Sequence, residues 1–376
     1  MAADADAPAP DRRRMRVTII LLGLTSIALA ALAIALIRDS SSSPGGDDDL
    51  FGAAKGAPLD SADLDRMVET GVRSVRFVIS WPAVEPHEGS FNWGSTDQLV
   101  GGLASRGIRP VPSLFGSPAW ISPNPVRPPI DSAKARTAWQ AFLKAAVERY
   151  GPGGEYWTDG YPQRFGRDAG ALPIESWQIW NEPNLPHYFA PRSSAPEYTQ
   201  LLELSHEAIT AQDPGAEIVL AGMPGYGKPD TAWEFLDKIY EQPGAKSDFD
   251  VVALHPYART VGQLEQEIEK LRGAMAKHGE AQTPLWLTEV GWGSAPPDRF
   301  GLNKGLSGQE RMLSDSFELI LDHRESWHVE RLFWFDWRDP PKGTPQACSF
   351  CSSAGLLERN GEPKPAWSAY KSFATG

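Results

Sequence analysis

Residues 174–184 have the sequence IESWQIWNEPN, in which a strand-like run ends on a polar tetrapeptide. The run 174–180 has the length and the branched and aromatic side chains of a buried β-strand. A helical pattern follows over about 196–212, and a second strand-like run follows at 217–221. A strand, a helix and a strand in this order predict a βαβ unit, whose two strands lie parallel.

The same alternation continues on both sides of this unit. The sequence contains eight strand-like runs, which are 51–54, 74–79, 109–114, 174–180, 217–221, 249–254, 285–288 and 331–335. Helical patterns separate them, and capping residues such as Asp60 and Ser132 precede two of these helices. Eight strand–helix units over residues 50–376 predict an α/β fold of the (β/α)8 TIM-barrel type. A doubly wound sheet is the alternative, but the sequence lacks the glycine-rich first turn that such a sheet normally carries.

The composition favours a folded, acidic domain. Hydrophobic residues make up 41% of the 376 residues, which is enough to form a large core and excludes a disordered chain. The chain has 36 Lys and Arg against 48 Asp and Glu, a net charge of −12. Because nucleic-acid binding needs a basic surface, we expect no nucleic-acid partner.

The N-terminal segment predicts a membrane anchor. Residues 17–37 contain no charge and no proline, and roughly 20 such residues cross a bilayer as a helix. Four arginines lie within 12–16, just before this run. The positive-inside rule then predicts a cytoplasmic segment 1–16, a single transmembrane helix 17–37, a flexible linker 38–49 and an extracytoplasmic domain at the cell membrane. A signal peptide cleaved near Ala33-Ile34-Ala35 is the alternative, and it would make the protein secreted.

Two glutamates follow strand-like runs whose ends should meet. Glu182 follows 174–180, and Glu289 follows 285–288. Because the carboxyl ends of TIM-barrel strands form the active face, we expect the two carboxyls to lie together. Burial there raises a carboxyl pKa, and a neighbouring carboxylate raises one of the pair further. One protonated acid beside one ionised acid is what glycoside hydrolysis requires, and a pair of structural, salt-bridged acids is the alternative.

The motifs around these glutamates resemble those of clan A glycoside hydrolases. The resemblance lies in Trp180-Asn181-Glu182-Pro183, Thr288-Glu289-Val290-Gly291-Trp292 and His255-Pro256-Tyr257, and it extends over about residues 50–374. Members of this clan are retaining enzymes on TIM barrels. Family 39, with its β-xylosidases and α-L-iduronidases, is the most similar branch, and family 5 shares the core motifs. The resemblance implies a retaining O-glycosyl hydrolase whose substrate is an oligosaccharide, a polysaccharide or a glycoside.

The resemblance also implies roles for the residues nearest to the reaction. Glu182 corresponds to the general acid/base and Glu289 to the nucleophile. Asn181 corresponds to a residue that hydrogen-bonds the sugar 2-hydroxyl, and a turn-capping role is its alternative. Arg76 corresponds to the arginine that keeps the nucleophile ionised, since a neighbouring cation lowers a carboxyl pKa.

Four further residues are predicted to bind the substrate. Tyr257 resembles the tyrosine that donates to the nucleophile. His255 lies two residues before it, where a structural histidine of the core is the alternative. Trp334 resembles the aromatic platform on which a sugar stacks, and Trp337 is the alternative platform.

Cys348 and Cys351 are the two cysteines of the chain. In an exported domain this pair predicts a disulfide that closes a short loop. A thioredoxin-like redox site would need a βαβ context of its own, and a zinc site would need two further ligands. The sequence carries no motif for a cofactor or a metal, so we expect neither.

The leading hypothesis is therefore a membrane-anchored, extracytoplasmic retaining glycosidase. A surface carbohydrate-binding pseudoenzyme is one alternative, although it would be expected to lack one of the two glutamates. A transglycosylase, in which a sugar replaces water as the acceptor, is the other. Many clan members carry a histidine where this sequence has Phe115-Gly116-Ser117, and this difference bears on the substrate rather than on the reaction.

Overall fold

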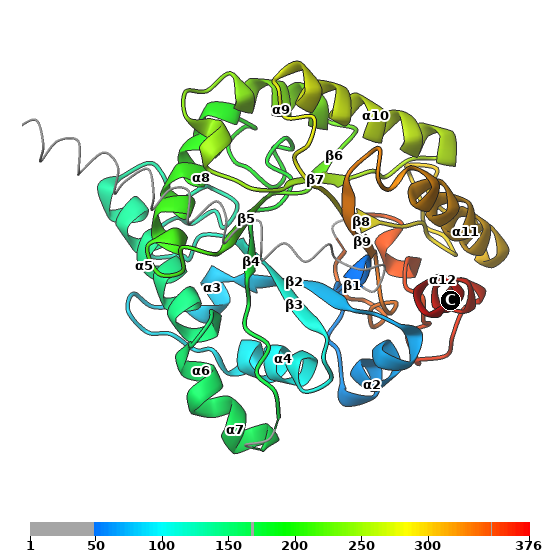
Figure 1. Cartoon of the computed structure of the whole chain (residues 1–376), viewed down its shortest axis with the longest axis horizontal. Helices are drawn as coiled ribbons and strands as arrows, with labels where there is room; N and C mark the ends of the chain where they lie inside the picture. Colours follow the sequence, from blue (N-terminus) through cyan, green and yellow to red (C-terminus); the bar gives the residue numbers. More distant parts are fainter. Residues whose placement is uncertain (1–48, 167–168, 347) are drawn as a thin grey trace, which may run out of the picture. The chain divides into compact units, whose positions relative to one another are not determined.

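The computed structural model describes residues 49–166, 169–346 and 348–376, which form one sheet surrounded by helices (Figure 1). The predicted cytoplasmic segment, transmembrane helix and linker lie outside these residues, except for Asp49. None of the helices in the described ranges is both long enough and apolar enough to cross a membrane. The membrane anchor at 17–37 therefore stays a prediction.

Nine strands of the described chain form the sheet, in the order β5-β4-β3-β2-β1-β9-β8-β7-β6. All pairings between these strands are parallel. The sheet curls and closes beside β7, because Leu220 N–H donates to Val251 O (2.9 Å) and Val251 N–H donates to Ile218 O (3.2 Å). The strands are β1 (Phe51–Ala54), β2 (Ser74–Ser80), β3 (Arg109–Phe115), β4 (Ser176–Ile179), β5 (Glu217–Leu220), β6 (Met223–Pro224), β7 (Val252–His255), β8 (Leu285–Val290) and β9 (Val329–Trp334).

The eight predicted strands are all present, and together they form the TIM-barrel-like architecture that their alternation with helices indicates. β6 was not expected. It follows β5 after two residues, and β5 pairs with β4 while β6 pairs with β7. β5 and β6 thus share the place of one barrel strand. The largest difference in a boundary is at β7, which begins at Val252 rather than at 249.

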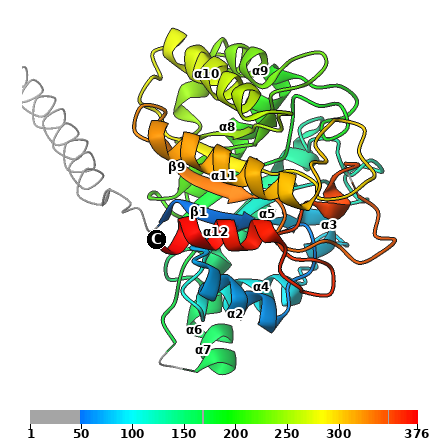
Figure 2. The ribbon, with the colours of Figure 1, turned by 90° about the vertical axis from the view of Figure 1, so that its right-hand side faces the viewer.

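Helices surround the sheet, and α11 and α12 lie against β9 and β1 (Figures 1 and 2). The sequence patterns did not indicate α4, because Gly94, Gly101 and Gly102 lower its helix propensity. The helices are α2 (Ser61–Thr70), α3 (Trp81–Val84), α4 (Gly94–Ala104), α5 (Ala133–Tyr150), α6 (Glu155–Thr158), α7 (Gly160–Phe165), α8 (Ala195–Thr210), α9 (Ala232–Tyr240), α10 (Val261–Lys277), α11 (Leu306–His323) and α12 (Pro365–Thr375).

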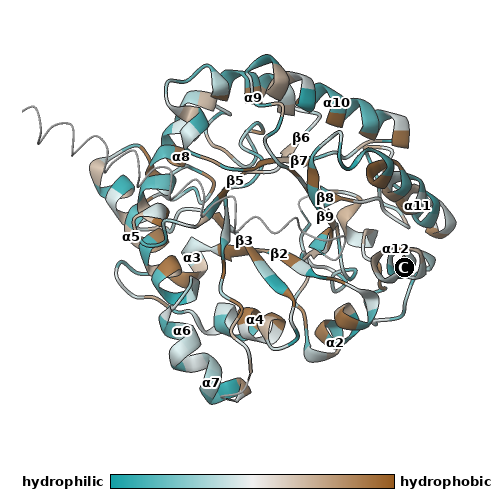
Figure 3. Ribbon diagram, viewed as in Figure 1, coloured by the Kyte–Doolittle hydropathy of each residue, from teal (hydrophilic) through white to brown (hydrophobic). Residues whose placement is uncertain are grey.

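Two layers of buried apolar side chains hold the barrel together. The larger layer lies between the strands and the helices, and Figure 3 shows apolar strands inside helices whose outer faces are largely hydrophilic. The smaller layer packs residues of different strands against one another and consists of Ala54, Val111, Val219, Val251, Ala253, Trp286 and Phe333. Because side chains fill a barrel of this kind, its chemistry takes place at the ends of the strands.

A buried ion pair holds the C-terminal tail. Lys364 Nζ lies 2.7 Å from Asp339 Oδ1, and the two side chains are 1% and 9% exposed. The same ammonium group donates to Ser294 Oγ (3.0 Å) and to Ser353 O (3.1 Å). Lys364 directly precedes α12, so these contacts attach the last helix to the loops that follow β8 and β9.

Replacing Lys364 with methionine should lower the free energy of unfolding by about 3–5 kcal/mol, because Asp339 would remain as a buried, unpaired charge. Urea denaturation followed by tryptophan fluorescence measures this change. Lys144→Met is the matched control, since Lys144 pairs with Glu148 on the surface, where both side chains are 54% exposed. It should change the stability by less than about 1 kcal/mol, and an equal loss in the two variants would contradict the prediction.

Candidate active site

The structure brings Glu182 and Glu289 together at the carboxyl ends of their strands. Glu182 is the third residue after β4, whereas Glu289 lies within β8, which is longer than predicted. One oxygen of each carboxyl and one ring nitrogen of His255 all lie within 4.8 Å of one another. The Glu182 side chain is buried, at 8% exposure, and the Glu289 side chain is largely buried, at 12%. The two glutamates therefore form one site.

Arg76, in β2, joins the two strands that carry the glutamates. Its guanidinium donates through Nη1 to Glu289 Oε1 (2.5 Å) and through Nη2 to Asn181 Oδ1 (2.9 Å). The third donor, Nε, bonds to Gln178 Oε1 (2.6 Å) in β4. Since Asn181 Oδ1 already accepts from Arg76, the amide nitrogen of Asn181 is the end of that side chain that can donate to a ligand. Arg76 and Asn181 thus lie where the sequence placed them.

His255, the last residue of β7, and Tyr257, which follows that strand, complete the wall of the site. The Tyr257 hydroxyl donates to Glu289 Oε2, and His255 Nδ1 lies 2.8 Å from Glu182 Oε1 and 3.7 Å from Glu289 Oε2. Burial and the negative charge of Glu289 raise the pKa of Tyr257 well above its ordinary value, so its phenol stays a hydrogen-bond donor. His255 therefore contacts both carboxyl groups and is not only a structural histidine of the core.

The surroundings move the pKa values of the two carboxyls in opposite directions. Burial raises the pKa of Glu182, and the charge of Glu289 adds to this rise, while contact with His255 opposes it. Burial also acts to raise the pKa of Glu289. The attraction of His255 and Arg76 and the hydrogen bond from Tyr257 outweigh this effect, and the pKa of that carboxyl lies below its ordinary value. The geometry therefore favours a protonated Glu182 beside an ionised Glu289.

The backbone around Glu182 is held in an unfavourable conformation. Trp180 has φ of +71° and Glu182 has φ of +44°, in a region that side-chain-bearing residues rarely adopt and that costs on the order of 1–3 kcal/mol each. Ser113 Oγ donates to Trp180 O (2.8 Å), and Glu182 N–H donates to Gly222 O (3.1 Å). A Cβ atom at Gly222 would lie 2.0 Å from His255 Nε2, so glycine is required there. These contacts turn the Glu182 side chain into the site.

The prediction of a sugar-stacking platform at Trp334 or Trp337 is wrong. Both side chains are fully buried, and Trp334 donates its indole N–H to Ala354 O (3.2 Å) while Trp337 donates to Asp63 Oδ1 (3.2 Å). Successive residues of a strand point to opposite faces, so Trp334 points to the helices and Phe335 does not. Phe335 is partly exposed and packs on the small inner layer of the barrel, with its ring centroid 6.1 Å from that of Tyr257.

Sequence reasoning did not identify three other residues of the site. Gln178 accepts from Arg76 and also donates to Leu220 O (2.9 Å). A glutamine within an otherwise apolar strand was the sequence feature that could have indicated its role in the site. Burial and the charges of Glu182 and Glu289 raise the pKa values of Tyr188 and Tyr226. These tyrosines lie in loops, where no periodic pattern indicates a position.

The structure joins Cys348 and Cys351 by a disulfide, as predicted. The bridge spans Phe350, which is buried and packs with its ring centroid 5.2 Å from that of Tyr257. The neighbouring Ser349 Oγ accepts a hydrogen bond from Arg299 N–H (2.9 Å). The disulfide loop therefore supports the tyrosine that donates to Glu289.

Glu182, His255 and Glu289 also place their ligand atoms close enough for a metal ion. The two oxygens of Glu289, however, already accept hydrogen bonds from Arg76 and Tyr257. A guanidinium 2.5 Å from a ligand oxygen would repel a second cation. The donor set therefore suits acid–base chemistry better than metal binding.

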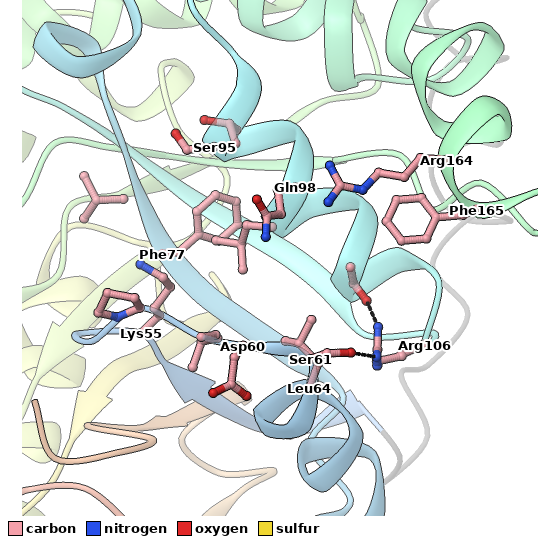
Figure 4. Close-up of a pocket in the computed structure, with 16 residues that line it drawn as sticks. Lys55, Asp60, Ser61, Leu64, Phe77, Ser95, Gln98, Arg106, Arg164 and Phe165 are labelled. Atoms are coloured by element: carbon pink, nitrogen blue, oxygen red, sulfur yellow. Dashed lines mark hydrogen bonds between the residues drawn. The ribbon is translucent and has the colours of Figure 1, made fainter. Parts of the chain in front are cut away.

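A cavity of about 500 Å³ lies elsewhere, between α2, α4 and β2 (Figure 4). Leu64, Phe77 and Leu99 contribute apolar surface, and Arg106 donates to Ser61 Oγ (2.7 Å) at its edge. Of the described residues that line this cavity, none is a predicted site residue. The cavity is therefore separate from the two glutamates.

A TIM-barrel-like fold with two glutamates of opposite pKa shift at the strand ends has the arrangement that glycoside hydrolysis requires. Comparison with known families gives the same class. Residues 172–370, more than half of the chain, match the family described as Glycosyl hydrolase catalytic core, and the chain belongs to this family. Residues 59–149 match the family described as Beta-galactosidase. No curated protein sequence matches the chain.

Solved structures of glycoside hydrolases have the same fold. A family 39 glycoside hydrolase from the gut symbiont Bacteroides cellulosilyticus WH2 is 19% identical with a TM-score of 0.65. The similarity covers 88% of this chain and 64% of the family 39 enzyme. A monomeric β-xylosidase from Caulobacter crescentus CB15 is 20% identical with a TM-score of 0.62, and the similarity covers 87% of this chain and 68% of the xylosidase. GH5_18 from Streptomyces cattleya, solved with GlcNAc, is 18% identical with a TM-score of 0.64, and the similarity covers 86% of this chain and 79% of GH5_18. The expected similarity to clan A near family 39 is confirmed, and the chain spans less than two thirds of the family 39 enzyme.

Proposed function

We propose that the protein hydrolyses O-glycosidic bonds by double displacement, with Glu289 as the nucleophile and Glu182 as the acid/base. The observation that carries the proposal is the pair of buried carboxyls with opposite pKa shifts, whose nearest oxygens lie within 4.8 Å. Retaining enzymes separate their carboxyls by roughly 5–5.5 Å, whereas inverting enzymes leave roughly 6.5–9.5 Å for a water molecule. The short separation supports retention of configuration.

In the first step, a Glu289 oxygen attacks C1 of the sugar and forms an ester bond. The bond between C1 and the leaving oxygen breaks, and that oxygen takes the proton of Glu182. In the second step, Glu182 as carboxylate removes a proton from water, whose oxygen attacks C1. The ester bond breaks, and its electron pair returns to Glu289. Arg76 and Tyr257 stabilise the anionic form of Glu289 at the beginning and end of this cycle.

The substrate class in this proposal is β-glycosides. Among proteins of the same fold, one is a β-xylosidase, one an exo-β-1,4-mannosidase and one an endo-β-1,4-xylanase. The family that residues 59–149 match is described as Beta-galactosidase. A transglycosylase would use the same first step and differ in the acceptor. A binding-only pseudoenzyme would not need two carboxyls with opposite pKa shifts.

Trapping of the glycosyl-enzyme tests the proposal. A 2-deoxy-2-fluoro-β-glycoside with a dinitrophenyl leaving group should add one fluorosugar to the protein, since the fluorine slows the second step more than the activated first step. Mass spectrometry of peptides should place the sugar on Glu289. A label on another residue, or inverted product from every substrate of a β-glycoside panel, would contradict the mechanism.

The proposed location is the outer side of a membrane, with residues 17–37 as a single-pass anchor. The support is the uncharged run of this segment and the arginines that precede it. Membrane fractions should contain the full chain, and protease added to intact cells should release a soluble fragment that begins within 38–52. Recovery of the full chain from the soluble cytoplasm would contradict this location.

A further inference from the structure

Two exposed aromatic rings lie side by side near the candidate active site. Tyr226 and Phe300 are 39% and 41% exposed, whereas Trp334 and Trp337 are fully buried. The two rings are stacked, with centroids 6.0 Å apart and planes that differ by 21°. Tyr226 follows β6 and Phe300 lies in the loop after β8, so both come from the carboxyl ends of strands. An exposed stacked pair on this face of a barrel is available to a ligand.

The Tyr226 side of this pair adjoins the loop that carries Glu182. Partial burial and the negative charges of Glu182 and Glu289 raise the pKa of Tyr226, so its phenol stays protonated as a hydrogen-bond donor. The backbone before Tyr226 also contacts the loop that carries the acid/base. Gly222 O accepts from Glu182 N–H (3.1 Å), and Pro224 O accepts from Asn184 Nδ2 (3.1 Å). Tyr226 therefore lies on the Glu182 side of the site.

The backbone of Phe300 is fixed from several directions. Its N–H donates to Asp298 Oδ1 (2.8 Å), and its carbonyl accepts from Arg259 Nε (2.8 Å). Asp298 Oδ2 accepts in addition from Asn303 N–H (2.7 Å). A ring on a backbone held in this way loses little conformational freedom when it contacts a ligand, so its contact favours binding.

We propose that Tyr226 and Phe300 form a platform for a sugar ring in the leaving group. The inference rests on the proposed function, because Glu182 can protonate only the oxygen of a leaving group on its own side. Stacked aromatic faces match the C–H face of a sugar, while the Tyr226 hydroxyl can meet sugar hydroxyls. The substrate class is thus β-linked disaccharides and longer oligosaccharides, rather than β-glycosides of small alcohols.

Two substrates with the same sugar test this platform. A β-disaccharide carries a leaving sugar, whereas the matching β-glycosyl fluoride carries none. The probes are the glucosyl, galactosyl, mannosyl and xylosyl fluorides with their β-1,4-disaccharides. Phe300→Ala should lower kcat/KM about tenfold on the disaccharide and leave kcat/KM on the fluoride unchanged. Tyr226→Ala should give the same pattern.

Phe91→Ala is the matched control, because Phe91 is also exposed and stacks on another ring, that of Trp93 at 5.8 Å. It should leave both substrates unchanged. If Phe300→Ala lowers kcat/KM equally on the disaccharide and on the fluoride, the ring contacts the sugar that is transferred and not the leaving sugar, and the inference is overturned. An unchanged kcat/KM on both substrates would also overturn it. A wild-type enzyme that cleaves fluorides but no disaccharide would overturn this inference alone. One that cleaves no fluoride would overturn the proposed function as well.

Discussion

Replacing Glu289 with alanine should lower kcat/KM by about 10⁴-fold or more on every β-glycoside, whatever its leaving group. The variant cannot form the glycosyl-enzyme, and the covalent route supplies much of the acceleration of such an enzyme. A good leaving group does not compensate, because the missing step is the attack on C1. Initial rates with a β-disaccharide and with a dinitrophenyl β-glycoside measure both losses.

Azide distinguishes a lost nucleophile from a damaged fold. The anion can occupy the space of the Glu289 carboxylate and attack C1 from the same face, so a β-substrate should yield an α-glycosyl azide. Glu217→Gln is the matched control, since Glu217 is a partly buried glutamate at the start of β5 whose Oε2 accepts from Ser176 Oγ (2.7 Å). It should keep most of the activity. A β-configured azide product from Glu289→Ala would show that another residue is the nucleophile.

The strands and the two glutamates could be predicted because each depends on local information. Strand-like runs alternate with helical patterns, and parallel strands then bring their carboxyl ends to one face. Glu289 follows such a run directly and Glu182 follows one after a single residue, so their proximity needed only the strand order around the barrel. The place of Arg76 beside Glu289 was implied by the resemblance to clan A, and the structure shows the hydrogen bond, although the two residues are 213 positions apart.

The sequence did not indicate which aromatic side chains could bind a sugar. A shift of one position along a strand decides whether a ring is buried, and the other candidates lie in loops. Trp334 and Phe335 are adjacent aromatics at the end of β9, and the direction of each side chain decides which one is buried. Tyr226 and Phe300 are 74 positions apart in two loops, as the numbering shows, and no pattern in the sequence indicates that their rings stack. Such positions need the structure, since loops have no periodic signal.

Replacing Glu182 with alanine should produce losses that depend on the leaving group. On a β-disaccharide, whose alkoxide leaves poorly without a proton, kcat/KM should fall by about 10²–10⁴-fold. On a dinitrophenyl β-glycoside, whose phenolate needs no proton, kcat/KM should fall little, because Glu289 still attacks C1. The second step should become slow, since Glu182 no longer activates water. The glycosyl-enzyme should then accumulate and be visible by mass spectrometry.

Azide and pH give this variant a signature that a structural defect cannot imitate. Azide needs no general base, so it should speed the release of sugar from Glu182→Ala and yield a β-glycosyl azide, opposite to the product of Glu289→Ala. In the wild-type enzyme the first step requires a protonated Glu182, so kcat/KM should fall as the pH rises through the pKa of this carboxyl, which burial raises. In Glu182→Ala with the dinitrophenyl substrate, this alkaline decrease should disappear while the acidic decrease, set by protonation of Glu289, remains. If the alkaline decrease persists in the variant, a group other than Glu182 supplies the proton.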